Sequence, residues 1–262
     1  CFVILWYEGK MYGLNASGPA PKSLSVAALK DRGFEKIPSY GVEPIDVPGA
    51  VAGWMTLHER FGKLPLEEVM APAIRYAEEG YPVTPNISRL WQEAFENYSK
   101  YRDRPEFQGW FDTFAPNNTW LKPGEMFRCP DMAKTLKEIA ATKGESFYRG
   151  AIAEKIDAFF KKHNGFLTKE DLAAFKPEWV DPISVNYHGV DVWELPPNGH
   201  GITVLMALQI LKDMKLGERD CVDTMHKQIE AMKLAMVDTA QYVAEPSYMK
   251  VPAKNTLPNA AL

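Results

Sequence analysis

The chain has 262 residues, of which 46% are apolar, and a net charge of −4 at pH 7. That apolar content suffices for one large domain or two small ones. Acidic and basic residues are interspersed, so neither a basic stripe for nucleic acid nor an acidic tail is present. An aromatic content of 12% argues against disorder. No apolar run approaches the ~20 residues of a membrane-spanning helix. The composition therefore predicts no nucleic-acid and no membrane partner.

Most of the elements predicted in the first two thirds of the chain are helices. The chain opens with apolar strands over 2–7 and 10–15, which Glu8-Gly9 joins into a hairpin. Residues 102–130 are rich in aromatic and helix-breaking residues and predict a long insertion that lies over another part of the molecule. Gly62 and Gly80 are typical of helix C-termini. Thr84-Pro85 is typical of a helix start, with Thr84 as the N-cap and proline at the first helical position. Amphipathic spacing predicts helices over 23–31, 50–61, 65–79, from 85 onward, over 130–141 and over 148–162.

The last third predicts a second hairpin followed by two long helices. Thr168 to Asp171 has capping-box spacing. Apolar and polar residues alternate over 183–187, and a second strand runs to Leu195. Residues 201–214 read as a buried helix, and 220–243 as a helix with one apolar stripe. That stripe suits a partner surface and comprises Val222, Met225, Ile229, Met232 and Met236.

The number of strands is small for the number of helices. We count about eight helices and four strands, too few strands for so many amphipathic faces to cover. Either the fold is mostly α, or another chain supplies strands; we favour the second explanation. Residues 251–262 read as a released tail. The chain starts inside a strand without an initiator Met, which predicts that residues precede it. Localisation is therefore left open among cytoplasmic, which we favour, periplasmic and secreted.

Most standard catalytic motifs are missing from the sequence. It contains no phosphate-binding glycine loop, no HExxH and no GxSxG. Its five histidines lack metal-ligand spacing, so no metal site is predicted. Its three cysteines form no CxxC pair and read as reduced, structural thiols.

Cys1 leaves two interpretations open. It could be an N-terminal nucleophile with its own amine as base, or a small buried hydrophobe within a strand. The stripe at 222–236 adds a third alternative, a free-standing helical binding module.

Three blocks of sequence carry a specific resemblance. The first spans residues 46–54 and is continued by 60–65 and 73–83. The second spans 165–175, then Tyr187-His188-Gly189, 196–201 and 208–211. The third is 223–226 with 230–235. Together and in this order they resemble the large subunit of γ-glutamyltranspeptidases over roughly residues 1–250.

The resemblance implies a fold and a processing event. In this family a zymogen precursor cuts itself into a large and a small subunit, and the small subunit's new N-terminal Thr is the nucleophile. The fold implied is α+β, a four-layer αββα N-terminal-nucleophile hydrolase sandwich, to which this chain supplies the helix-rich part and a few strands. Residues 1–262 would form a single domain, incomplete at both ends, co-folded with the small subunit. Cys1 would be an interior strand residue, and this chain would hold no catalytic residue.

Three residues at the end of the second strand and directly after it are the candidate substrate-binding residues: Asn15, Ser17 and Gly18. Transpeptidases of the family hold the substrate α-carboxylate with an Arg where this chain has Ser17. The loop looks more like the acylase and small-amide-hydrolase branch, which includes oxamate amidohydrolase. That branch more often has Arg where Pro19 stands, so this chain departs from it too. A plain turn after the strand is the alternative.

The resemblance therefore implies the large subunit of a γ-glutamyltransferase-like amidohydrolase, cleaving γ-glutamyl or other acyl amides. Its partners would be its own small subunit and a small-molecule amide substrate; a dimer of such heterodimers is left open. No metal or organic cofactor is implied. The alternatives are a catalytically inactive scaffold homologue and an acylase without γ-glutamyl specificity.

Overall fold

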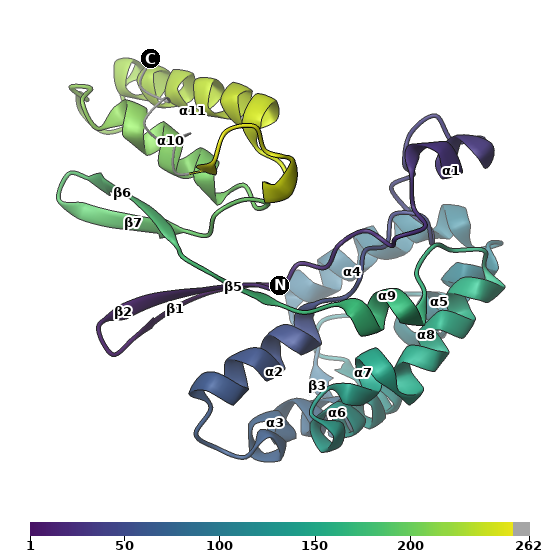
Figure 1. Cartoon of the computed structure of the whole chain (residues 1–262). Helices are drawn as coiled ribbons and strands as arrows, with labels where there is room; N and C mark the ends of the chain where they lie inside the picture. Colours follow the sequence, from purple (N-terminus) through teal and green to yellow (C-terminus); the bar gives the residue numbers. More distant parts are fainter. Residues whose placement is uncertain (254–262) are drawn as a thin grey trace. The chain divides into compact units, whose positions relative to one another are not determined.

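A computed structural model describes residues 1–253 (Figure 1). The chain divides into two compact units. Unit 1 comprises residues 1–16 and the chain from residue 178 onward, and unit 2 comprises residues 17–177. The segment predicted as a released tail lies outside the described residues from residue 254 onward.

Unit 1 begins with a three-stranded antiparallel sheet. Its order is β1 (Phe2–Tyr7), β2 (Lys10–Asn15) and β5 (Glu178–Val180). Glu8 and Gly9 both have positive φ, 49° and 77°, as a two-residue hairpin turn requires. The first predicted hairpin is confirmed. Strand β5 was not predicted, because it has only three residues and they show no alternating apolar pattern.

A second layer of unit 1 pairs a hairpin with two helices. The hairpin β6 (Ile183–Tyr187) and β7 (Val190–Glu194) packs against α10 (Gly201–Leu211), and α10 packs against α11 (Val222–Tyr242). The core of this layer is formed by Ile202, Leu205 and Met206, which are fully buried. The predicted hairpin and the buried helix are confirmed, although α10 ends three residues early.

Helix α11 turns its smallest residues toward α10. Ala231, Ala235 and Thr239 are buried, and the hydroxyls of Thr203 and Thr239 share a hydrogen bond of 2.7 Å. The predicted apolar stripe lies on another face, where its five side chains are between 38% and 88% exposed. Small residues let the two helices approach closely, and the larger apolar residues are left uncovered in this chain.

Unit 2 is almost entirely helical. Its helices are α1 (Val26–Asp31), α2 (Ala50–Phe61), α3 (Leu66–Glu79), α4 (Pro85–Tyr98), α5 (Gln108–Phe114), α6 (Pro130–Thr142), α7 (Glu145–Arg149), α8 (Ala151–Lys162) and α9 (Lys169–Ala174). A two-stranded ribbon, β3 (Tyr81–Pro82) with β4 (Met126–Phe127), completes the unit. The described residues thus hold eleven α-helices and seven strands, more of each than the sequence predicted.

Several predicted helix ends of unit 2 are confirmed. The Thr84 hydroxyl accepts the Ile87 N–H, and Pro85 occupies the first turn of α4. Thr168 and Asp171 form the predicted capping box of α9. Amphipathic spacing also suggests that Leu66, Val69 and Met70 share one buried face of α3; Leu66 and Met70 are buried, but Val69 is exposed, so that expectation was wrong for Val69.

The predicted helix over 148–162 is in fact two helices. The break falls at Gly150, with α7 before it and α8 after it. A β-carbon at Gly150 would lie 2.8 Å from the Ser146 Cα, so the chain can turn this tightly only at glycine.

The region predicted as a long insertion has a core of its own. It contains α5 and packs Phe107, Phe111 and Ala115 together. The rings of Tyr98 and Trp110 lie 4.7 Å apart, and the Arg102 guanidinium lies 4.1 Å from the Phe111 ring centroid. Aromatic packing of this kind stabilises a segment without a helical apolar repeat.

Candidate functional site

Asn15 is the last residue of β2. Its neighbours Leu14 and Ala16 are fully buried, so the strand end is anchored in the core of unit 1. The Asn15 side chain points away from that core, and its Nδ2 donates to Oδ1 of Asn198 over 3.1 Å. This contact fixes the orientation of the Asn15 carboxamide, which would otherwise rotate between donor and acceptor.

Asn198 was not among the predicted site residues. It lies in the loop between β7 and α10, within the Pro196-Pro197-Asn198-Gly199 segment of the second sequence block. Its separation of 183 positions from Asn15 leaves no local signal of the pairing. The only sequence signal for Asn198 was its position within the second sequence block.

Ser17 and Gly18 open unit 2. A β-carbon at Gly18 would lie 1.7 Å from the carbonyl oxygen of Val47, so no other residue fits at this position. The Val47 N–H donates to the Pro19 carbonyl over 3.0 Å, which joins the two loops. Gly18 is therefore required by close backbone approach, and Ser17 sits directly before this fixed point.

The three candidate substrate-binding residues fall on both sides of the boundary between the units. Asn15 belongs to unit 1, whereas Ser17 and Gly18 belong to unit 2. Each is well defined within its own unit. Their role in substrate binding stays a prediction.

Helix α2, which lies within the first sequence block, is held at its start by a tyrosine. The Tyr148 hydroxyl donates to the Pro48 carbonyl over 2.7 Å and accepts the Ala52 N–H over 3.0 Å. Burial of the Tyr148 side chain raises the pKa of its hydroxyl, which therefore stays protonated and keeps donating. Tyr148 thus ties the start of α2 to α7.

Cys1 differs in part from its prediction. The Ala16 N–H donates to the Cys1 carbonyl over 2.8 Å, so its backbone continues the ladder of β1 and β2, as expected of a strand residue. Its side chain, however, is exposed, and the prediction of a buried hydrophobe was wrong. None of Cys1, Cys129 and Cys221 is in a disulfide with another described residue, and their reduced, structural role stays a prediction.

Among residues 1–253, no cluster of three or more His, Cys, Asp or Glu side chains has an arrangement suited to a metal ion. None of the helices within that range combines the length and apolar character needed to cross a membrane.

Comparison with known proteins identifies the family. The γ-glutamyltranspeptidase family model matches residues 1–262. The glutathione hydrolase proenzyme of Pseudomonas aeruginosa is 33% identical over 259 residues, which are 96% of this chain and 45% of that protein. The chain belongs to the γ-glutamyltranspeptidase family.

Solved structures extend this likeness to the fold of the family. The cephalosporin acylase from Bacillus halodurans has 51% sequence identity and a TM-score of 0.96, covering 99% of this chain and 49% of that one. The Helicobacter pylori γ-glutamyltranspeptidase has 26% identity and a TM-score of 0.89, covering 99% and 75%. The predicted α+β fold of this family, rich in helices in this portion, is confirmed. The chain spans about half the length of the curated relatives it matches.

Proposed function

We propose that this chain is the large-subunit part of a self-processing amidohydrolase. Its nucleophile would be the N-terminal Thr of a small subunit cut from the same precursor. The observation that carries the proposal is the family match along the whole chain, together with relatives named as proenzymes of about twice its length.

The uncovered apolar surfaces of unit 1 support a co-folded partner. Phe2, Ile4 and Trp6 alternate along β1 and are exposed on one face of the sheet. The stripe on α11 is exposed as well. Contiguous apolar surfaces of this kind mark interfaces, and the small subunit is the occupant that a proenzyme would supply. On this proposal both units form a single domain with that subunit.

The proposed reaction is hydrolysis of an amide through an acyl-enzyme. The Thr hydroxyl attacks the acyl carbonyl while the Thr α-amine accepts its proton. The substrate C–N bond breaks, the leaving amine takes up a proton, and water then hydrolyses the ester. This chain contributes one wall of the acyl pocket at Asn15, Ser17 and Gly18, and oxyanion donors come mostly from the small subunit.

The acyl group proposed lacks a glutamyl head. A serine hydroxyl at position 17 cannot replace a guanidinium fork, whose loss costs about 1.5–3 kcal/mol of binding. The higher identity to the cephalosporin acylase structure, 51% against 26% for the transpeptidase, supports the same assignment.

An assay of self-processing tests the proposal. The purified precursor is incubated and followed on a denaturing gel, with N-terminal sequencing of each band. We expect two bands, the smaller beginning with Thr, and turnover of butyryl-p-nitroanilide that exceeds that of γ-glutamyl-p-nitroanilide. A single precursor band with no new N-terminal Thr would indicate an inactive scaffold. Vigorous γ-glutamyl transfer to glycylglycine would overturn the substrate assignment.

A further inference from the structure

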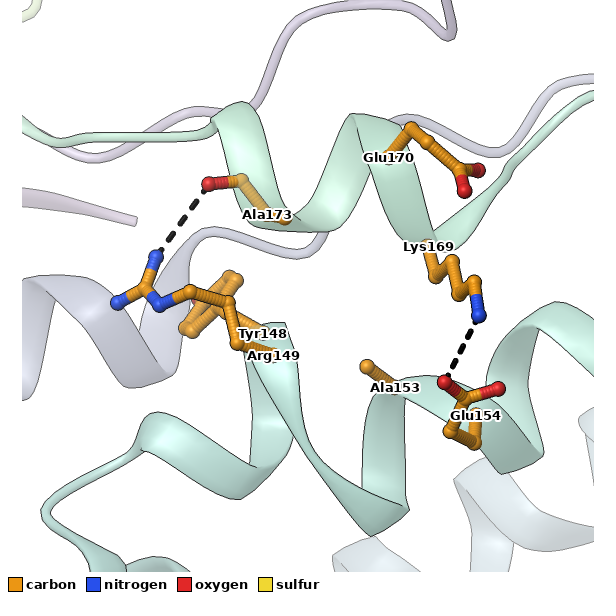
Figure 2. Close-up of a pocket in the computed structure, with 7 residues that line it drawn as sticks. All are labelled: Tyr148, Arg149, Ala153, Glu154, Lys169, Glu170 and Ala173. Carbon is orange, nitrogen blue, oxygen red and sulfur yellow. Dashed lines mark hydrogen bonds and ion pairs between the residues drawn. The ribbon is translucent and has the colours of Figure 1, made fainter.

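A cavity of about 260 Å³ lies among α7, α8 and α9 of unit 2 (Figure 2). None of the predicted substrate-binding residues lines it. Its apolar lining comes from Tyr148, Ala153 and Ala173. At ~30 Å³ per water molecule, the space equals about nine waters. It therefore suits a ligand of roughly dipeptide size.

The walls of the cavity are held by partly buried hydrogen bonds. The Tyr148 hydroxyl is bound to the start of α2 through Pro48 and Ala52. The start of α9 is held by the Thr168 capping box and by Asp157, whose Oδ1 accepts the Lys169 N–H over 3.2 Å. A site that is already ordered loses little entropy when it binds a ligand.

The two ends of the cavity differ in their charged groups, because Arg149 at one end is ion-paired with Glu145 while the other end carries one cation and two anions. Figure 2 shows Arg149 at one end, and Lys169, Glu154 and Glu170 at the other. Two bridges join α9 to the helices below it, one from Arg149 Nη1 to the Ala173 carbonyl (3.3 Å) and one from Lys169 Nζ to Glu154 (2.9 Å).

Spare hydrogen-bonding capacity remains at each end. Arg149 has five N–H groups; its Nε and Nη2 each donate once to Glu145, and Nη1 donates once to Ala173. Two of its N–H groups thus have no acceptor among the described residues. Glu154 uses one oxygen for Lys169, and the Glu170 carboxylate interacts with Lys169 through charge but accepts no hydrogen bond from a described residue. The Lys169–Glu154 pair is 41% and 62% exposed, so it is weak and free to rearrange.

We propose that this cavity binds a short zwitterion, a dipeptide with small side chains. Its carboxylate would accept from Arg149, and its ammonium would donate to Glu154 and Glu170. Its methyl groups would lie against Ala153 and the Tyr148 ring. Binding here goes beyond the proposed hydrolysis and does not depend on it, because the cavity lies wholly within unit 2.

Calorimetric titration of the intact purified protein with L-alanyl-L-alanine tests the proposal. We expect one saturable site per chain. N-acetyl-alanyl-alanine, which lacks the ammonium, and alanyl-alanine amide, which lacks the carboxylate, should each bind about tenfold more weakly. Free L-alanine should also bind more weakly, because it cannot reach both ends.

Two cavity variants and two matched controls locate the binding. R149Q and E170Q should each weaken alanyl-alanine binding about tenfold, whereas R75Q and E67Q on the exposed face of α3 should leave it unchanged. If R149Q fails to fold, E170Q alone tests where the dipeptide binds, because the Glu170 side chain makes no hydrogen bond that the fold needs.

Absence of binding at millimolar dipeptide would overturn the proposal. So would equal affinity in cavity variants and controls, or equal affinity for the N-acetylated peptide or free alanine. Because the readout is heat of binding, a protein that fails to process can still pass this test.

Discussion

Ser17 occupies the position where the family resemblance places the carboxylate-binding arginine of transpeptidases. We predict that S17R raises kcat/KM for γ-glutamyl-p-nitroanilide at least about tenfold, because a guanidinium can pair with the α-carboxylate. Turnover of butyryl-p-nitroanilide, which has no carboxylate, should not rise. S17Q is the control, since it adds length without charge. An unchanged ratio of the two substrates in S17R would place the carboxylate elsewhere.

Asp157 is a buried carboxylate whose charge supports unit 2. Its oxygens accept from Lys161 Nζ (2.6 Å) and from the Lys169 N–H (3.2 Å). The hydrogen bond from Lys161 holds the pKa of Asp157 below its usual 3.8, despite burial of the side chain. The folded protein thus binds this proton less readily than the unfolded chain, so the stabilisation is fully present above about pH 4 and is lost as pH falls further.

We therefore predict that D157N lowers stability by about 1–3 kcal/mol at pH 7. Thermal midpoints of wild type and variant should converge as the pH falls below 3.8, because the stabilisation by the ionised carboxylate is lost progressively as the pH approaches the lowered pKa of Asp157 in the folded protein. D131N is the control, because Asp131 forms an ion pair on the exposed start of α6; its midpoint should stay near that of wild type. A D157N deficit that stays undiminished down to the lowest pH at which the wild type remains folded would contradict the assignment.

Single residues also show what sequence can and cannot reveal. The capping box of Thr168 and Asp171 was predictable because all its atoms lie within four consecutive residues. The requirement for glycine at position 18 was not, because it comes from Val47, far along the chain. The pairing of Asn15 with Asn198 was hidden for the same reason.

At the level of elements, periodic patterns were reliable where an element was long. The spacing predicted α2 with its observed bounds and identified both hairpins. It missed β5 and α5, which are short and are held by pairing with β2 and by aromatic packing respectively. Such elements have too few residues to show a repeat, and tertiary contacts decide their structure.

The stripe on α11 can be tested as an interface. Ile229 lies in its middle and is about half exposed in this chain. We predict that I229E sharply reduces the amount of processed heterodimer recovered by size exclusion, because it places an unpaired charge in an apolar contact. Q228E alters the neighbouring exposed position and should have little effect, as surface substitutions usually do. Equal recovery of both variants would mean that the stripe faces solvent.

For the whole molecule, the two compact units and the uncovered surfaces of unit 1 bear on whether this chain folds alone. Unit 1 exposes apolar side chains on β1, including Trp6, and on α11, including Met236 and Val237. An apolar edge strand such as β1 can also pair with other chains.

We predict that residues 1–262 aggregate when produced alone, and that supplying the remainder of the precursor from a second plasmid returns them to the soluble fraction. The physical reason is that apolar surface left in water favours association, whereas the proposed small subunit would bury it. Soluble yield and light scattering with and without the second plasmid measure the effect. An unrelated protein on that plasmid controls for expression load. A contrary result would be that residues 1–262 alone are monomeric and show a single cooperative unfolding transition. The chain would then be the free-standing helical module, and the small subunit would not be needed to complete the fold.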